Sequence, residues 1–204
     1  MRIAAAPLLL ALALAGCATA KPPAWVPAEG TYTADRAGFQ IDGPAGWMRR
    51  NYQPPVETFL ATRDGTALQR IVAGTTELGK PLGFGKSKRP VTAGMSPAEL
   101  GELVVDDLQS ADDLTDVRLL ESAPAQVCGR PGFHVLAAFR DAGLPRRATL
   151  YGATDGGRLF WIYYVAPERH YYPLDLPTFD KVRETFRLRG APPPAPAPAA
   201  PPTS

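Results

Sequence analysis

Residues 158–166 read RLFWIYYVA, and this stretch decides the fold that the sequence predicts. In a strand, successive side chains point to opposite faces. Both faces of this strand are apolar, with Phe160, Ile162 and Tyr164 on one and Leu159, Trp161, Tyr163 and Val165 on the other. A strand buried on both faces belongs to a sheet that is covered on both sides. The stretch therefore predicts a central sheet between two covering layers.

The segments around this stretch predict its partner strands. Strand-like runs precede it at residues 115–122, 124–128, 133–141 and 146–154, and glycine-rich turns separate them as in an antiparallel meander. Residues 38–42 alternate apolar and polar side chains and predict a further strand. Asp64-Gly65 lies between the apolar runs 56–63 and 66–78 and predicts a type I′ hairpin.

Two helices are expected to cover the sheet. Ser96-Pro97-Ala98-Glu99 forms a capping-box pattern with proline in the first turn, which starts a helix. Its apolar face consists of Leu100, Leu103, Val104 and Leu108, while Glu99, Glu102, Asp106 and Asp107 are expected to point outward. Residues 176–187 predict the second helix. The predicted class is α+β, an α/β/α sandwich with a central twisted antiparallel sheet covered by helices on both faces.

The order of these segments resembles the PsbP-like superfamily over residues 35–188. The resemblance rests on four patterns and a closing helix: Phe39-Gln40-Ile41, Pro44-Ala45-Gly46-Trp47, Leu68-Gln69-Arg70-Ile71, Tyr163-Tyr164-Val165-Ala166-Pro167, and the pair Phe179 and Phe186. That superfamily includes photosystem extrinsic subunits, a nuclear-transport GTPase-binding protein and bacterial envelope lipoproteins. The resemblance implies an adaptor or accessory role without an established catalytic site.

The amino terminus is typical of an exported lipoprotein. Residues 1–16 carry Arg2 and an apolar run that is too short to span a bilayer, so they predict a signal peptide. The run ends in Leu14-Ala15-Gly16-Cys17, which resembles the bacterial lipobox. That resemblance implies lipidation of Cys17 at the mature amino terminus, and Ala18 after it resembles outer-membrane sorting. The alternative is ordinary secretory cleavage near Ala18-Thr19-Ala20.

Composition divides the rest of the chain. Residues 17–30 are expected to be a lipidated cysteine followed by a proline-rich tether, and residues 31–189 a single globular domain. Residues 190–204 are almost wholly alanine and proline and predict a disordered tail, or a spacer toward the cell wall.

Charge and metal-ligand content exclude several function classes. The 204 residues include 22 basic and 20 acidic side chains, so no strong field favours nucleic acid. Two cysteines cannot by themselves build a tetrahedral zinc site, and two histidines leave few ligands for a catalytic transition metal. We therefore expect no cofactor, no metal and no nucleic-acid partner.

The residues for nucleophilic catalysis are sparse. His134 lies in a predicted strand, and His170 lies in a polar corner before the last helix. Cys128 is expected at a strand end, either buried and inert or reactive, and a Cys128–His134 pair is a further alternative. Gly85-Lys86-Ser87 resembles the end of a phosphate-binding loop, but Lys80 stands where that motif needs glycine.

Two surface features are candidates for contact with a partner or a surface. The loop 79–94 carries Lys80, Lys86, Lys88 and Arg89, and is expected to be long, mobile and basic. Tyr171 and Tyr172 are expected to be an exposed aromatic pair outside the strand.

Together these features predict a non-catalytic, lipid-anchored binding or accessory protein. It would sit in the outer membrane and face the periplasm, with an envelope protein or peptidoglycan as its partner. The alternatives are a small hydrolase or ligand carrier with a cleft near His170 and Tyr171, and a structural spacer between membrane and cell wall.

Overall fold

The computed structural model describes residues 23–189 and shows two helices and two antiparallel sheets in that range. The elements are β1 (Trp25–Pro27), β2 (Gly30–Ala34), β3 (Phe39–Gly43), β4 (Met48–Arg50), β5 (Phe59–Thr62), β6 (Arg70–Glu77), α1 (Pro97–Gln109), β7 (Leu114–Val127), β8 (Arg130–Asp141), β9 (Leu144–Asp155), β10 (Arg158–Pro167), α2 (Tyr171–Thr185) and β11 (Arg187–Leu188). No helix within residues 23–189 is long and apolar enough to cross a membrane.

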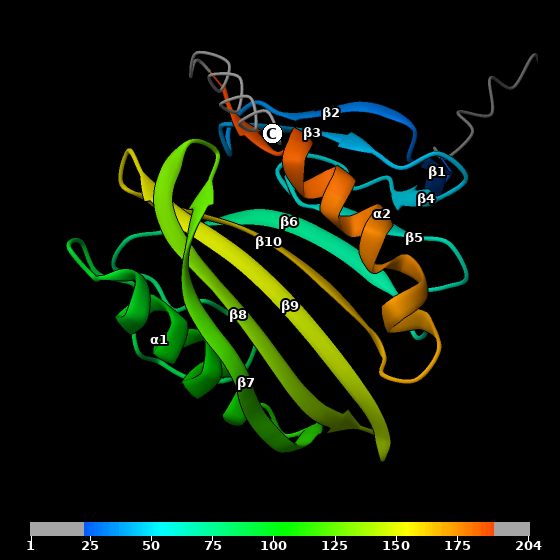
Figure 1. Cartoon of the computed structure of the whole chain (residues 1–204). Coiled ribbons are helices and arrows are strands. Elements are labelled where there is room, and N and C mark those ends of the chain that lie inside the picture. Colours follow the sequence, from blue (N-terminus) through cyan, green and yellow to red (C-terminus); the bar gives the residue numbers. More distant parts are fainter. Residues whose placement is uncertain (1–22, 190–204) are drawn as a thin grey trace, which may run out of the picture.

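The larger sheet has eight strands in the order β1-β4-β5-β6-β10-β9-β8-β7 (Figure 1). The predicted α+β class and the antiparallel meander are confirmed, since β7 to β10 pair in chain order. The runs 115–122 and 124–128 form one strand, β7, which contains two register shifts. Strand β10 pairs with β6 as well as β9, so it lies inside the sheet as its apolar sequence requires.

The two faces of β10 belong to different hydrophobic clusters. Phe160, Ile162 and Tyr164 pack in the cluster that contains Phe179 of α2. Leu159 and Trp161 pack in the cluster that contains Leu103 of α1. Alternation along this one strand therefore joins the two helices through a shared sheet.

A small second sheet, which the sequence did not predict, has the order β11-β3-β2. The predicted strand at 38–42 belongs to it as β3, and Phe39 packs edge-on against Phe186 at the end of α2 with ring centroids 5.4 Å apart. The folded part also begins before residue 31, because β1 pairs with β4 inside the segment expected to be a tether.

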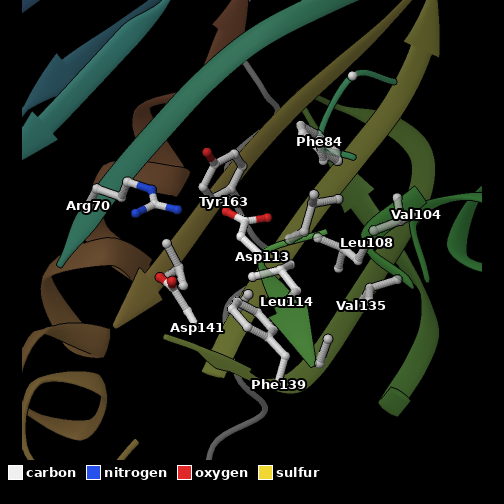
Figure 2. A pocket seen from close by; sticks show the side chains of 15 residues that line it. Arg70, Phe84, Val104, Leu108, Asp113, Leu114, Val135, Phe139, Asp141 and Tyr163 are labelled. Carbon is white, nitrogen blue, oxygen red and sulfur yellow. The ribbon is translucent and has the colours of Figure 1, made fainter. Parts of the chain in front are cut away.

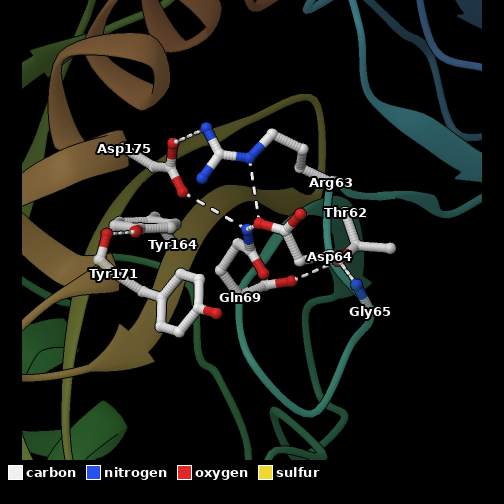
Figure 3. A network of polar contacts seen from close by, with 8 residues as sticks. All are labelled: Thr62, Arg63, Asp64, Gly65, Gln69, Tyr164, Tyr171 and Asp175. Carbon is white, nitrogen blue, oxygen red and sulfur yellow. Dashed lines mark hydrogen bonds and ion pairs between the residues drawn. The ribbon is translucent and has the colours of Figure 1, made fainter.

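The predicted type I′ turn at Asp64-Gly65 is wrong, although β5 and β6 do pair. Of these two residues only Gly65 has a positive φ, 106°, whereas a type I′ turn needs both. A polar network replaces the tight turn (Figure 3). Arg63 forms an ion pair of 2.9 Å with the buried Asp175 of α2, and the Gln69 Nε2 donates to Asp64 at 2.7 Å. The connection is thus a wider loop fastened to α2.

Candidate ligand-binding site

A cavity of about 220 Å³ lies between α1, the loop 79–94 and the large sheet. Figure 2 shows its lining side chains. Val104 and Leu108 of α1 form one wall, Val135 and Phe139 of β8 form another, and Phe84 comes from the loop. The cavity is therefore mostly apolar and is enclosed by elements far apart in the sequence.

The capped start of α1 positions its wall. Ser96 accepts a hydrogen bond from the backbone of Glu99, and the Glu99 carboxylate accepts one from Ser96, so the predicted capping box is confirmed. These bonds also lower the pKa of Glu99. The helix then places Val104 and Leu108 on the side that faces the sheet.

The loop wall is held by Asp107, and the prediction that this residue points outward from the helix is wrong. Asp107 is 1% exposed, and its carboxylate accepts backbone hydrogen bonds from Phe84 at 2.8 Å, Gly85 at 3.1 Å and Ser87 at 3.2 Å. Gly85 is required here because a Cβ would overlap the Asp107 carbonyl. The bonds bring Phe84 over the cavity.

Aromatic packing completes this wall. Phe84 packs edge-on against Trp161, with centroids 5.0 Å apart, and against Tyr163 at 5.6 Å. Trp161 and Tyr163 stack on each other, and the Trp161 Nε1 donates to Thr76 at 3.1 Å. The predicted core role of these strand aromatics therefore holds for Trp161, while Tyr163 is half-buried and lines the cavity.

Charged groups gather at the other end of the cavity. Figure 2 shows Arg70, Asp113 and Asp141 around one side of the opening. The Arg70 Nη1 donates to the Thr66 carbonyl at 3.1 Å. Asp141 lies 2.9 Å from the Nε of Arg146, whose pKa is lowered by burial. A ligand with an apolar body and a polar end would fit this cavity. Its body would lie in the interior and its polar end at these charges.

The polar side chains of the lining are Arg, Asp and Tyr, and no Ser, Cys, His or Lys is among them. A serine or cysteine nucleophile beside a histidine or lysine base is therefore not found among the residues that line this cavity. Within residues 23–189, no group of three or more His, Cys, Asp and Glu side chains could hold a metal ion.

The basic loop is fixed to α1 rather than free. Arg89 pairs with Asp106 at 2.5 Å, and Lys86 pairs with Asp112. The backbone of Lys86 and of Ser87 donates to the Ser110 hydroxyl, each at 2.7 Å. Lys80 and Lys88 are exposed and form no ion pair within residues 23–189. Contact of the basic residues of this loop with a partner or a surface stays a prediction.

The prediction of an exposed tyrosine pair is wrong for Tyr172, which is buried, and Tyr171 is only partly exposed. Helix α2 begins at Tyr171, five residues before the predicted start, and it carries Tyr172 into the core at 7% exposure. Burial raises the pKa of Tyr172 to about 12. Tyr171 is half-buried, and its carbonyl accepts a hydrogen bond of 2.6 Å from Tyr164. His170 is exposed next to Tyr171, and neither residue lines the cavity under α1.

His134 contacts a hydroxyl and a carboxylate, but not Cys128. Its Nε2 lies 2.9 Å from the Thr149 hydroxyl and its Nδ1 lies 3.5 Å from Glu121, while its ring stacks on Tyr151 at 4.4 Å. Thr149 is 3% exposed, which leaves no path for a substrate to its hydroxyl. Burial lowers the pKa of His134.

Cys128 is a turn residue with an unreactive setting. Cys128 and Gly129 both have positive φ between β7 and β8, and the thiol donates to the Phe186 carbonyl at 3.2 Å. Burial raises the pKa of Cys128 to about 12, which suppresses the nucleophilic thiolate. Cys128 is half-buried rather than buried, and its setting favours the inert alternative over the reactive one.

Other predictions lie outside the described residues. They include the signal peptide, Cys17 and the tail at 190–204.

Comparisons with solved structures identify the fold. No protein-family model matches the sequence, and no curated protein does so either. The cyanobacterial PsbP of Synechocystis sp. PCC 6803 is similar in structure with a TM-score of 0.53 at 14% identity, over 86% of this chain and 98% of that one. The chain has the PsbP-like fold.

Two further structures share this PsbP-like fold. The Ran-binding protein Mog1p of Saccharomyces cerevisiae has a TM-score of 0.53 at 10% identity, over 80% of this chain and 96% of its own. LpqN of Mycobacterium tuberculosis, described as involved in cell envelope biogenesis, has a TM-score of 0.50 at 15% identity, over 81% and 90%. The predicted resemblance to the PsbP-like superfamily is thus confirmed at the level of the fold.

Proposed function

We propose that this protein is a lipid-anchored accessory protein of the bacterial envelope, held in the outer membrane through Cys17 and facing the periplasm, and that it acts by binding rather than catalysis. The lipobox-like sequence before Cys17 supports the anchor. The fold shared with an envelope-biogenesis protein and with a Ran-binding protein supports an accessory role.

The observation that carries the binding role is the apolar cavity under α1. Its walls are apolar and aromatic, and its charges stand at one end. Such a cavity suits an apolar side chain of a partner or the apolar part of a small ligand. If the protein carries a ligand, we therefore propose this cavity as the binding site instead of a cleft near His170 and Tyr171.

We also infer that the expected α/β/α layering positions this site. Helices α1 and α2 pack in two hydrophobic clusters that contain side chains from opposite faces of β10. The cavity therefore lies on one face of the sheet and the cluster around α2 lies on the other.

The anchor is tested by membrane fractionation and by mass spectrometry of the mature amino terminus. An acylated Cys17 and release of a Cys17→Ala variant from membranes are the expected results. Membrane retention of Cys17→Ala, or an unmodified amino terminus at another residue, would contradict the anchor.

The binding role is tested by filling the cavity. Ala137 lines it and is 1% exposed, so Ala137→Leu would occupy part of the volume. Crosslinked envelopes from wild type should yield a specific protein or ligand that this variant loses while remaining folded. Equal recovery from both would contradict the cavity, and recovery of peptidoglycan alone would favour the spacer.

A further inference from the structure

A second cavity, of about 630 Å³, lies where β7 begins, β8 ends and β9 begins. Its lining contains four arginines and two carboxylates: Arg118, Arg140, Arg146, Arg169, Asp116 and Glu168. We call this cavity the arginine cleft. The residues on each side of it come from strand ends and from the segment that leads into α2 (Figure 1).

Both carboxylates of the cleft already have cationic partners. Asp116 lies 3.2 Å from the Nε of Arg140. Glu168 accepts two hydrogen bonds from Arg147, at 2.6 and 3.0 Å. The cleft therefore offers little free negative charge to a cation.

Two of its arginines remain without such a partner. Arg146 is paired with Asp141 at 2.9 Å, whereas Arg118 and Arg169 form no ion pair with any residue of 23–189. Both are exposed. The lining of the cleft thus contains two guanidinium groups without an ion-pair partner among residues 23–189, which is an arrangement that attracts an anion.

The backbone near the cleft adds to this field. Helix α2 starts at Tyr171, directly after Arg169 and His170, with no acidic residue in its first turn and no side-chain cap from His170. Its positive end is therefore not offset by a carboxylate of its own. On the other side, Asp116 has a φ of 53° within the first register shift of β7, and this bulge directly precedes Arg118.

We propose that the arginine cleft binds a phosphate group, with Arg118 and Arg169 as the main ligands. A guanidinium presents a planar fork of donors, and two forks can share the several oxygens of one phosphate, whereas a carboxylate offers only two oxygens. The volume leaves room for the organic part of a phosphate ester beside its anion. The cleft shares Phe139 with the cavity under α1, but Arg118 and Arg169 line only the cleft, and the proposal does not depend on the proposed function.

The test is calorimetric titration of the full-length protein with two water-soluble probes. Inorganic phosphate represents a free anion, and glycerophosphoglycerol represents the headgroup of an anionic phospholipid. The test variant is Arg118→Gln/Arg169→Gln, and the matched control is Lys80→Gln/Lys88→Gln, which removes the same charge from exposed and unpaired side chains of another loop. Thermal unfolding checks that each variant is folded.

The test variant should lose at least about tenfold in affinity for the better probe, while the control should change by less than about twofold. Tighter binding of glycerophosphoglycerol would support a phosphate site for lipid headgroups, and tighter binding of inorganic phosphate one for soluble phosphates. The proposal is overturned if neither probe binds wild type at about 10 mM. It is equally overturned if the control loses as much affinity as the folded test variant.

Discussion

Asp107 offers the sharpest test of how the fold builds the cavity. One buried carboxylate accepts backbone hydrogen bonds from Phe84, Gly85 and Ser87, and these hold the loop that carries Phe84. A hydrogen bond to a charged group contributes about 1.5–3 kcal/mol, and three that share one acceptor are not additive. We expect Asp107→Ala to lower the free energy of unfolding by about 3–5 kcal/mol, and Asp107→Asn by about 1–2 kcal/mol, since an amide keeps one acceptor oxygen.

Urea unfolding measures these losses, and amide hydrogen exchange locates them. In Asp107→Asn the amides of Phe84, Gly85 and Ser87 should exchange faster, while those of β8 and β9 should keep their protection. The matched control is Asp106→Asn, whose exposed pair with Arg89 should contribute at most about 1 kcal/mol. If the Asp106 and Asp107 variants lose equal stability, or if loop exchange is unchanged, the carboxylate does not hold the loop.

Three further predictions concern residues away from the cavity. In a Cys17→Ala background, Cys128 should react with a disulfide reagent at pH 8 roughly fifty- to a hundredfold more slowly than an ordinary thiol. Burial raises its pKa to about 12, and the loss of thiolate outweighs the greater nucleophilicity of a more basic thiolate. A rate near that of free cysteine would contradict the desolvated setting of the thiol. Gly101→Ala should stabilise α1 by less than the ~1 kcal/mol of an unhindered site, since its Cβ would lie 2.6 Å from the Ser122 hydroxyl and displace it, and adding Ser122→Ala should restore the full gain in urea unfolding. Burial lowers the pKa of His134 in the folded protein, so below the ordinary histidine pKa of 6.5 the unfolded chain binds more protons than the folded one. The free energy of unfolding should therefore rise as the pH rises toward 6.5. A His134→Gln variant should lose this contribution to the rise in melting temperature.

The meander was predictable because each of its strands carries its own local pattern. The glycine-containing connections between these strands were predicted as well, but their turn type was not. Cys128-Gly129, Ala142-Gly143 and Gly156-Gly157 each have two positive φ values between paired strands, as type I′ turns do. The Asp64-Gly65 signal had the favoured composition, but the contacts with Asp175 and Gln69 favour a wider loop. Tertiary contacts decided between equally acceptable local conformations.

The walls of the cavity were harder to predict than the elements that carry them. Helical spacing assigned Val104 and Leu108 correctly to the buried face of α1. The same spacing predicted that Asp107 faces solvent, because charged residues of an amphipathic helix are assigned to its solvent-facing side. The available signal was the glycine-containing stretch at 83–87, whose free backbone donors need an acceptor when the loop folds against a helix. Pairing that loop with that carboxylate requires the tertiary fold.

The cavity under α1 and the arginine cleft share one lining side chain, so only some variants can test one site without changing the other. Phe139 lines both the cavity under α1 and the arginine cleft, and the Asp141–Arg146 ion pair links a residue of one lining to a residue of the other. A substitution at any of these three positions would disturb both sites. Ala137 lines only the cavity, and Arg118 lines only the cleft. Because neither change removes a group that the other site uses, opposite effects of these two variants on partner recovery and on phosphate affinity would establish two independent sites on one sheet.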